Sequence, residues 1–128
     1  MLTITPIYAG LLLVLFFWLS LRVSLLRLKG GADTPAKRER LHRFVRTQGN
    51  ASEYIPAGLI AMLILEFQGA PAALLHLFGL MLIGGRIGHF LGFGLAPGNC
   101  ALRQYSMVAT YAMLIGSGLA ILWLALVG

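Results

Sequence analysis

Long stretches of apolar residues are the feature of this sequence that most limits how the chain can fold. Four such stretches occur, at about residues 4–28, 42–67, 72–95 and 102–127. A helix needs about 20 apolar residues to cross the hydrocarbon core of a bilayer, and a length of 128 residues leaves no room for a separate soluble domain. We therefore predict one all-α domain over residues 1–128, an integral membrane four-helix bundle with up-down topology.

The composition favours lipid over nucleic acid as the surroundings of this chain. Hydrophobic residues make up 59% of the sequence and charged residues only 11%, whereas a soluble protein has roughly 45–50% and about 25%. The formal net charge is +6, which basic loops beside anionic lipid explain. We predict membrane lipid as a partner and no nucleic acid. The single cysteine, Cys100, excludes an intrachain disulfide.

Turn residues separate the apolar stretches. Asp33 or Thr34 is a suitable N-cap before Pro35, so a helix is expected to start there. Residues 68–71 and 96–99 contain glycine and proline and predict the second and third connections. Pro56, inside the second apolar stretch, removes a backbone hydrogen bond and predicts a kink.

The distribution of cations predicts the orientation in the membrane. Eight of the ten lysines and arginines lie between Arg22 and Arg46, and Arg103 flanks the third connection. The positive-inside rule then places the first and third connections in the cytoplasm and both termini on the non-cytoplasmic side. The basic residues follow the first apolar stretch rather than precede it, which argues against a cleaved signal peptide.

A polar stripe crosses the start of the second apolar stretch. Arg43, Arg46, Asn50 and Glu53 follow one another at spacings of three, four and three, so they share one face of a helix, and Tyr54 lies at its edge. A charged side chain near the bilayer centre costs roughly 2.5–3.5 kcal/mol, which marks it as functional unless it is paired. Two interpretations stay open. Either the stripe binds a ligand with carboxylates and an ammonium, or the arginines set topology and Glu53 pairs with an arginine.

The third apolar stretch carries small residues and one histidine. Gly84, Gly88 and Gly92 recur every four residues and predict a face where another helix packs closely. A lone histidine such as His89 is by itself more typical of packing than of catalysis. No metal site is predicted, because the three histidines lack the spacing of metal ligands.

Two motifs in this sequence resemble those of a known family. The pattern Arg43-x-x-Arg46-x-x-x-Asn50-x-x-Glu53-Tyr54-x-Pro56 resembles the signature of the MAPEG family, the membrane-associated proteins in eicosanoid and glutathione metabolism. The segment Gly85-Arg86-Ile87-Gly88-His89-x-x-x-Phe93, with Arg103 beyond a proline-containing loop, is similar to the third and fourth helices of its prostaglandin E synthase branch. The resemblance covers essentially the whole chain and suggests a bacterial-type member.

The resemblance implies both an assembly and an activity. Family members are homotrimers that bind glutathione between subunits near the cytoplasmic face. Many of them conjugate glutathione to lipophilic electrophiles or reduce hydroperoxides. The resemblance thus implies a glutathione-dependent transferase or peroxidase in the bacterial inner membrane, with glutathione as co-substrate and a lipophilic small molecule as second substrate.

The resemblance also implies which residues of this chain act. Arg103 matches the arginine that activates the thiol. The residues that match glutathione contacts are Arg27, Arg46, Asn50, Glu53, Tyr54 and His89. Two positions depart from the family: Phe93 stands where several members have a tyrosine, and Gln104 stands where the prostaglandin branch has a serine.

Two other functions are compatible with a small helical membrane protein. One is a non-catalytic membrane protein that keeps the fold and binds glutathione or lipid, which the changes at Phe93 and Gln104 leave open. The other is a small proton-coupled transporter. The first apolar stretch has no acidic residue to carry the proton, and this disfavours the transporter.

Overall fold

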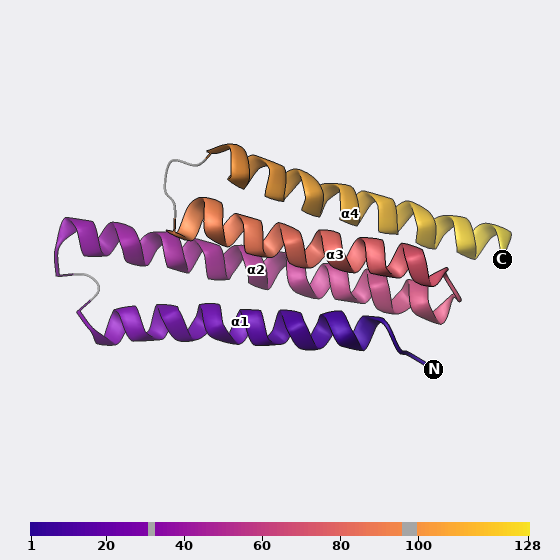
Figure 1. Ribbon diagram of the computed structural model, residues 1–128, viewed down its shortest axis with the longest axis horizontal. Coiled ribbons are helices and arrows are strands. Elements are labelled where there is room, and N and C mark those ends of the chain that lie inside the picture. The colour runs from indigo at the N-terminus through magenta and orange to yellow at the C-terminus, as the bar shows by residue number, and fades with distance from the viewer. Residues whose placement is uncertain (31–32, 96–99) are drawn as a thin grey trace.

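The chain forms a bundle of antiparallel helices (Figure 1). The computed structural model describes residues 1–30, 33–95 and 100–128. The elements in these residues are the α-helices α1 (Thr5–Leu28), α2 (Pro35–Phe67), α3 (Ala72–His89) and α4 (Cys100–Val127), with a π-helix, η1 (Phe90–Leu95), continuing α3. The predicted all-α, up-down bundle is confirmed. The turn predicted at residues 96–99 lies outside the described residues.

The two chain ends lie at the same end of the bundle. Figure 1 shows the α2–α3 turn at that end as well, while the end of α1, the start of α2, the end of η1 and the start of α4 lie at the opposite end. In the α2–α3 turn Gly69 has a φ of 77°, a left-handed conformation that glycine adopts without the steric cost of a Cβ atom. The turn predicted at residues 68–71 is therefore confirmed.

Helix α2 begins at Pro35, seven residues before the apolar stretch predicted at 42–67. The hydroxyl of Thr34 accepts a hydrogen bond from the Lys37 amide at 3.2 Å, and Pro35 occupies the first turn, as the N-cap prediction requires. Residues 35–40 are all exposed. The start of α2 therefore extends as a polar helix past the end of α3 (Figure 1).

Three segments of the described residues are long and apolar enough to cross a membrane: Thr5–Leu28, Ala72–Leu95 and Ala101–Val127. Helix α2 does not meet that measure, and its first half carries six of the fourteen charged residues of the chain. Many apolar side chains point outward from α1 and α4, among them Leu13, Val14, Phe17, Leu119, Leu122 and Trp123. Such outward faces suit contact with lipid rather than water. A crossing by residues 42–67 stays a prediction.

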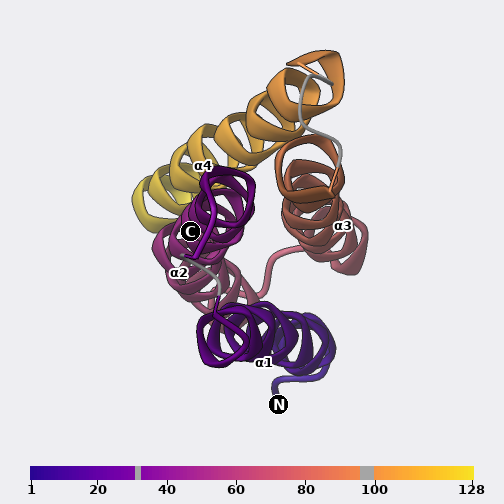
Figure 2. The same ribbon diagram turned by 90° about the vertical axis from the view of Figure 1, so that its left-hand side faces the viewer.

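The core lies where α2 and α3 meet the other two helices. Helix α1 packs on α2 and α3 from one side, and α4 packs on the same pair from the other. Figure 2 shows α1 and α4 on opposite sides of the bundle, and within the described residues these two helices have no contact. Fully buried side chains on the four helices include Leu12, Met62, Leu82 and Met113.

One carboxylate joins α2 to the start of α1. Glu66, in the last turn of α2, accepts hydrogen bonds from the backbone amides of Thr3, Ile4 and Thr5 at 2.5, 2.8 and 2.7 Å. The first amides of a helix have no partner within the helix, and an acidic group there also meets the positive end of the helix dipole. Glu66 therefore has a structural role at the end of the bundle where the termini lie.

Glycines let α3 and η1 approach α4 closely. A Cβ atom on Gly92 would lie 2.7 Å from the backbone nitrogen of Arg103, and one on Gly88 would overlap the Ser106 hydroxyl. Gly84 is exposed and has no atom within 4 Å of an added Cβ. The small-residue face predicted at 84, 88 and 92 therefore packs on α4 of the same chain, and Gly85, against Thr110, takes the place assigned to Gly84.

Candidate functional site

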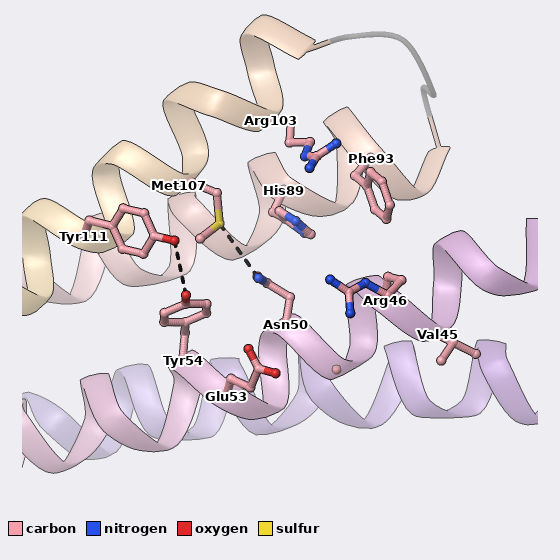
Figure 3. A pocket seen from close by; sticks show the side chains of 11 residues that line it. Val45, Arg46, Asn50, Glu53, Tyr54, His89, Phe93, Arg103, Met107 and Tyr111 are labelled. Atoms are coloured by element: carbon pink, nitrogen blue, oxygen red, sulfur yellow. Dashed lines mark hydrogen bonds between the residues drawn. The ribbon is translucent and has the colours of Figure 1, made fainter.

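A cavity of about 460 Å³ opens between α2, the junction of α3 with η1, and the first turns of α4 (Figure 3). Its volume lies within the range of roughly 300–1,000 Å³ that is typical of small-molecule sites. The side chains and backbone that line it belong to Val45, Arg46, Gly49, Asn50, Glu53, Tyr54, His89, Phe93, Arg103, Met107 and Tyr111.

The cavity brings together most of the residues singled out in the sequence. The members of that set that line it are Arg46, Asn50, Glu53, Tyr54, His89 and Arg103. On α2 the helical repeat explains the arrangement, because positions 46, 50, 53 and 54 lie on neighbouring turns of one face. The packing of α3 against α4 adds His89 and Arg103 from the opposite wall.

Charges of both signs face this cavity. Arg46 and Arg103 are exposed, and so is Glu53; Figure 3 shows their side chains projecting into the space between the helices. Within the described residues Arg43 forms an ion pair with Glu39 at 3.3 Å, whereas Glu53 forms none. The interpretation in which Glu53 pairs with an arginine is therefore not the arrangement found. Arg43 belongs to the predicted stripe but does not line the cavity.

Arg86, which the sequence did not single out as a site residue, organises the wall behind the cavity. Its side chain is only 2% exposed, and it donates hydrogen bonds to Asn50 Oδ1 and, at 2.7 Å, to Thr110 Oγ1. Its guanidinium carbon lies 5.0 Å from the ring centroid of Tyr54. The signal in the sequence was a cation in the middle of an apolar stretch, which is costly unless it has partners.

The contact with Arg86 determines which way Asn50 presents its amide. A guanidinium has donors and no acceptor, so the oxygen of Asn50 must face Arg86. The Asn50 nitrogen then points away, toward the sulfur of Met107 at 3.9 Å and the cavity (Figure 3). Asn50 therefore offers a donor, and the ligand group beside it must be an acceptor, such as a carboxylate or a thiolate.

Three side chains stack along the wall that η1 and α4 share. The ring centroid of buried His89 lies 5.6 Å from that of Phe93, and the guanidinium carbon of Arg103 lies 4.9 Å from the Phe93 centroid. A cation over an aromatic face is attracted to it without being neutralised. Phe93 thus lacks the hydroxyl of a tyrosine but holds the Arg103 guanidinium at the cavity.

The helix that carries His89 and Phe93 changes to a π-helix, η1, between these two residues. Residues 90–95 follow α3 without a break, in the wider turns of a π-helix. Such segments are rare and are frequent at functional sites. The predicted helix over 72–95 therefore has the right extent but changes its type in its last six residues.

Two tyrosines close the far side of the cavity. The hydroxyl of Tyr54 donates to that of Tyr111 at 3.3 Å, and their rings meet edge to face with centroids 5.9 Å apart. Tyr111 is 53% exposed, so the cavity reaches the outer face of α4. Sequence reasoning did not select Tyr111, because nothing in the α4 sequence distinguishes it from a lipid-facing aromatic residue.

Arg27 is the one residue of the predicted site that lies elsewhere. It is exposed in the last turn of α1, and the cavity is lined by α2, α3, η1 and α4. Within one chain, therefore, Arg27 and the cavity are separate.

Comparison with known proteins relates this chain to one family. The family model described as MAPEG matches residues 5–123. Two proteins named "Inner membrane protein YecN", from Escherichia coli strain K12 and from E. coli O6:H1, are each 37% identical to the chain over 83 residues. The match covers 65% of this chain but 62% of each relative, so the chain spans less than two thirds of these curated relatives. No solved structure matches it.

Proposed function

Because this chain belongs to the MAPEG family and is an integral membrane protein, we propose that it is a glutathione-dependent transferase or peroxidase. Its second substrates are lipophilic electrophiles or hydroperoxides dissolved in the bilayer. The single observation that carries the proposal is the cavity in which Arg46, Arg103 and Glu53 converge without pairing to one another.

The charges of the cavity match those of glutathione. The tripeptide has two carboxylates, one ammonium and a thiol. Glu53, which has no ion pair within the described part of the chain, suits the ammonium, and the Arg46 guanidinium suits a carboxylate through charge-assisted hydrogen bonds. The donor that Asn50 presents suits a second acceptor group. Arg103, on the opposite wall, is then left for the sulfur.

Arg103 supplies the positive charge that the chemistry needs. A thiol reacts as the thiolate, and a free thiol has a pKa of about 8.5, so a nearby cation increases the reactive fraction at neutral pH. Arg103 lies in the first turn of α4, where the amides and dipole of the helix start also favour an anion. His89, buried behind it, is the alternative, acting as a neutral base.

Two reactions follow from one activated sulfur. In the transferase reaction the thiolate attacks an electrophilic carbon, a C–S bond forms, and a leaving group departs or the adduct takes up a proton. In the peroxidase reaction the sulfur attacks the terminal peroxide oxygen, and the O–O bond breaks to give an alcohol and the sulfenate of glutathione. A second glutathione reduces that sulfenate to the disulfide and releases hydroxide, which takes up a proton to become water.

We also propose a homotrimer with the site shared between subunits. The cavity of one chain lacks Arg27, which the family resemblance includes among the glutathione contacts, and the residue is exposed on α1. A neighbouring copy is the available source of that arginine. We propose the bacterial inner membrane as the location, with both termini on the non-cytoplasmic side.

Calorimetric titration of the detergent-purified protein tests the proposal. Glutathione should bind saturably, while the dipeptide cysteinylglycine, which lacks the γ-glutamyl group and its carboxylate, should bind far more weakly. Turnover with an aryl halide and with an organic hydroperoxide then separates transferase from peroxidase. Binding without turnover would support the non-catalytic alternative, and absence of binding would contradict the proposal.

A further inference from the structure

The end of the bundle that carries the α1–α2 connection concentrates the charge of the whole protein. Residues 22–46 contain eight lysines and arginines and two acidic residues, so this segment alone accounts for the net charge of +6. The glutathione site that we propose uses Arg46 and, from a neighbouring copy, Arg27. Most of the cations in the segment therefore have no part in that site.

Two of these cations share one aromatic ring. The guanidinium carbon of Arg22, on α1, lies 5.5 Å from the centroid of the Phe44 ring, and that of Arg40, on α2, lies 5.9 Å from the same centroid. The two guanidinium carbons are therefore no more than about 11 Å apart. Phe44 itself is buried, with 1% of its surface exposed, so the position of the ring that both guanidinium groups contact is fixed by packing. Arg22 also lies 5.8 Å from the Trp18 ring.

Within the described part of the chain, neither guanidinium is neutralised by a carboxylate. In the described residues no carboxylate lies within 4 Å of Arg22 or Arg40, since Glu39 pairs with Arg43 instead. The Nε atom of Arg22 is buried and has no hydrogen-bond partner. Two like charges held beside one ring repel each other, and a buried donor without a partner costs free energy. An anion that contacts both guanidinium groups would offset their repulsion.

The position along α1 indicates which anion is within reach. A helix rises about 1.5 Å per residue, so a hydrocarbon core of about 30 Å counted from the start of α1 ends within a turn of Arg22. Trp18 and the six helical residues after Arg22 then flank the headgroup region. The anions concentrated at that depth are the phosphates of lipid headgroups.

We propose that Arg22 and Arg40 form a binding site for the headgroup phosphate of an anionic phospholipid. The acyl chains would follow the exposed apolar face of α1, and the headgroup would lie between α1 and the projecting start of α2. Arginine suits this role because its planar donors match phosphate oxygens and because it stays charged in a partly apolar setting. The site is independent of the cavity and of glutathione.

Native mass spectrometry of the detergent-purified protein tests this site. The protein is mixed with equal amounts of phosphatidylglycerol, which is anionic, and phosphatidylcholine, which is zwitterionic. The native protein should retain phosphatidylglycerol in preference, and Arg22→Gln and Arg40→Gln should each reduce that retention at least tenfold, because each removes charge-assisted hydrogen bonds to the phosphate and not only one positive charge. Lys37→Gln removes one exposed positive charge three residues before Arg40 in α2 and serves as the matched control.

Several outcomes would overturn the proposal. Equal loss of retention in all three variants would mean that net charge and not this arrangement attracts the lipid. Equal retention of the two lipids would exclude recognition of an anionic headgroup. Displacement of phosphatidylglycerol by an equal concentration of inorganic phosphate would assign the site to a soluble anion. Arg40 is exposed, so Arg40→Gln keeps the test decisive if Arg22→Gln fails to fold, and circular dichroism checks the helical content.

Discussion

In the proposed site, opposite charges two turns apart on one helix are the basis of ligand selection. Arg46 and Glu53 are separated by seven residues, which is about two turns of α2. Both are exposed at the cavity, and within the described residues neither pairs with the other. A ligand that carries separated positive and negative groups can therefore satisfy both at once, and a ligand with one charge cannot.

Truncating either charge should weaken glutathione binding. Losing one partner of a buried charge-assisted contact costs roughly 2–5 kcal/mol, because the other partner is left without its counter-charge. These residues are partly open to solvent, so we expect the lower part of that range, at least a tenfold rise in Kd for Arg46→Ala and for Glu53→Ala. Calorimetric titration measures it. Lys37→Ala, on the exposed start of α2, should leave the Kd unchanged, and equal effects from all three would contradict the assignment.

Removing the Arg103 guanidinium should affect the thiol more than it affects binding. Without that cation we expect Arg103→Ala to raise the pKa of bound glutathione, seen as a shift of the thiolate ultraviolet absorbance to higher pH. Turnover at neutral pH should then fall by more than the Kd rises, the signature of a lost transition-state contact. Phe93→Leu, which removes the ring beneath Arg103, should give a smaller shift in the same direction. An unchanged thiol titration would remove Arg103 from the mechanism.

Helical spacing was enough to predict the α2 side of the cavity from sequence, and it was not enough for the rest. Positions 46, 50, 53 and 54 repeat with the period of one helix, and such spacing can be read directly from the sequence. Arg86 escaped selection because its partners, Asn50 and Thr110, lie on two other helices. Contacts between helices distant in sequence depend on crossing geometry, and a single sequence does not contain that information.

At the scale of elements, the junction of η1 with α4 determines where Arg103, the proposed thiol-activating group, lies. Gly92 allows the backbone of η1 to touch that of Arg103 directly. The sequence predicted a face of small residues that recur every four positions, at Gly84, Gly88 and Gly92. In the structure Gly85, and not Gly84, lies against α4. Steric fit to Ser106 and Thr110 on α4 selects the actual face. The change to a π-helix at residue 90 likewise has no marker in the apolar pattern.

Adding one methyl group at this junction should displace α4. A Cβ on Gly92 would lie 2.7 Å from a backbone nitrogen, which cannot move as a flexible side chain does. Overpacking of this kind typically costs about 1–3 kcal/mol, so Gly92→Ala should lower the Tm in detergent and weaken the thiolate signal with glutathione. Gly84→Ala is the control. Its Cβ meets no atom within 4 Å, and alanine is a better helix former by about 1 kcal/mol. Equal Tm changes in the two variants would contradict the close contact.

At the scale of the whole molecule, the separation of Arg27 from the cavity makes a complementation test possible. In the proposed homotrimer each site takes Arg27 from one subunit and Arg46 from another. Arg27→Ala and Arg46→Ala subunits should each bind glutathione poorly alone. Co-expressed, they form mixed trimers in which some interfaces contain both native arginines, and part of the tight binding should return. Titration of the mixed trimers with glutathione measures the fraction of tight binding sites. If no tight sites appear, Arg27 lies outside the site.

The two termini lie at the same end of the bundle, which allows a direct test of the orientation of the protein in the membrane. Both lie opposite the basic connection between α1 and α2 (Figure 1), so the positive-inside rule predicts that neither faces the cytoplasm. A reporter that fluoresces only in the cytoplasm should stay dark when fused after Gly128. The same reporter inserted after Thr34 should be bright. The reverse pattern would move the proposed site to the other side of the membrane.

The opening of the cavity beside Tyr111 has a consequence for how selectivity should be understood. Tyr111 shares the outer face of α4 with Val108 and Ile115, which are 61% and 63% exposed, so a molecule dissolved in the hydrocarbon can approach sideways without entering water. Its local concentration is then set by partition between lipid and water. Each added methylene contributes about 0.8 kcal/mol to that transfer, so for the proposed enzyme we expect the apparent aqueous KM to fall about fourfold per methylene without any new contact to the protein. In the proposed function, the bilayer itself is the first filter on substrates.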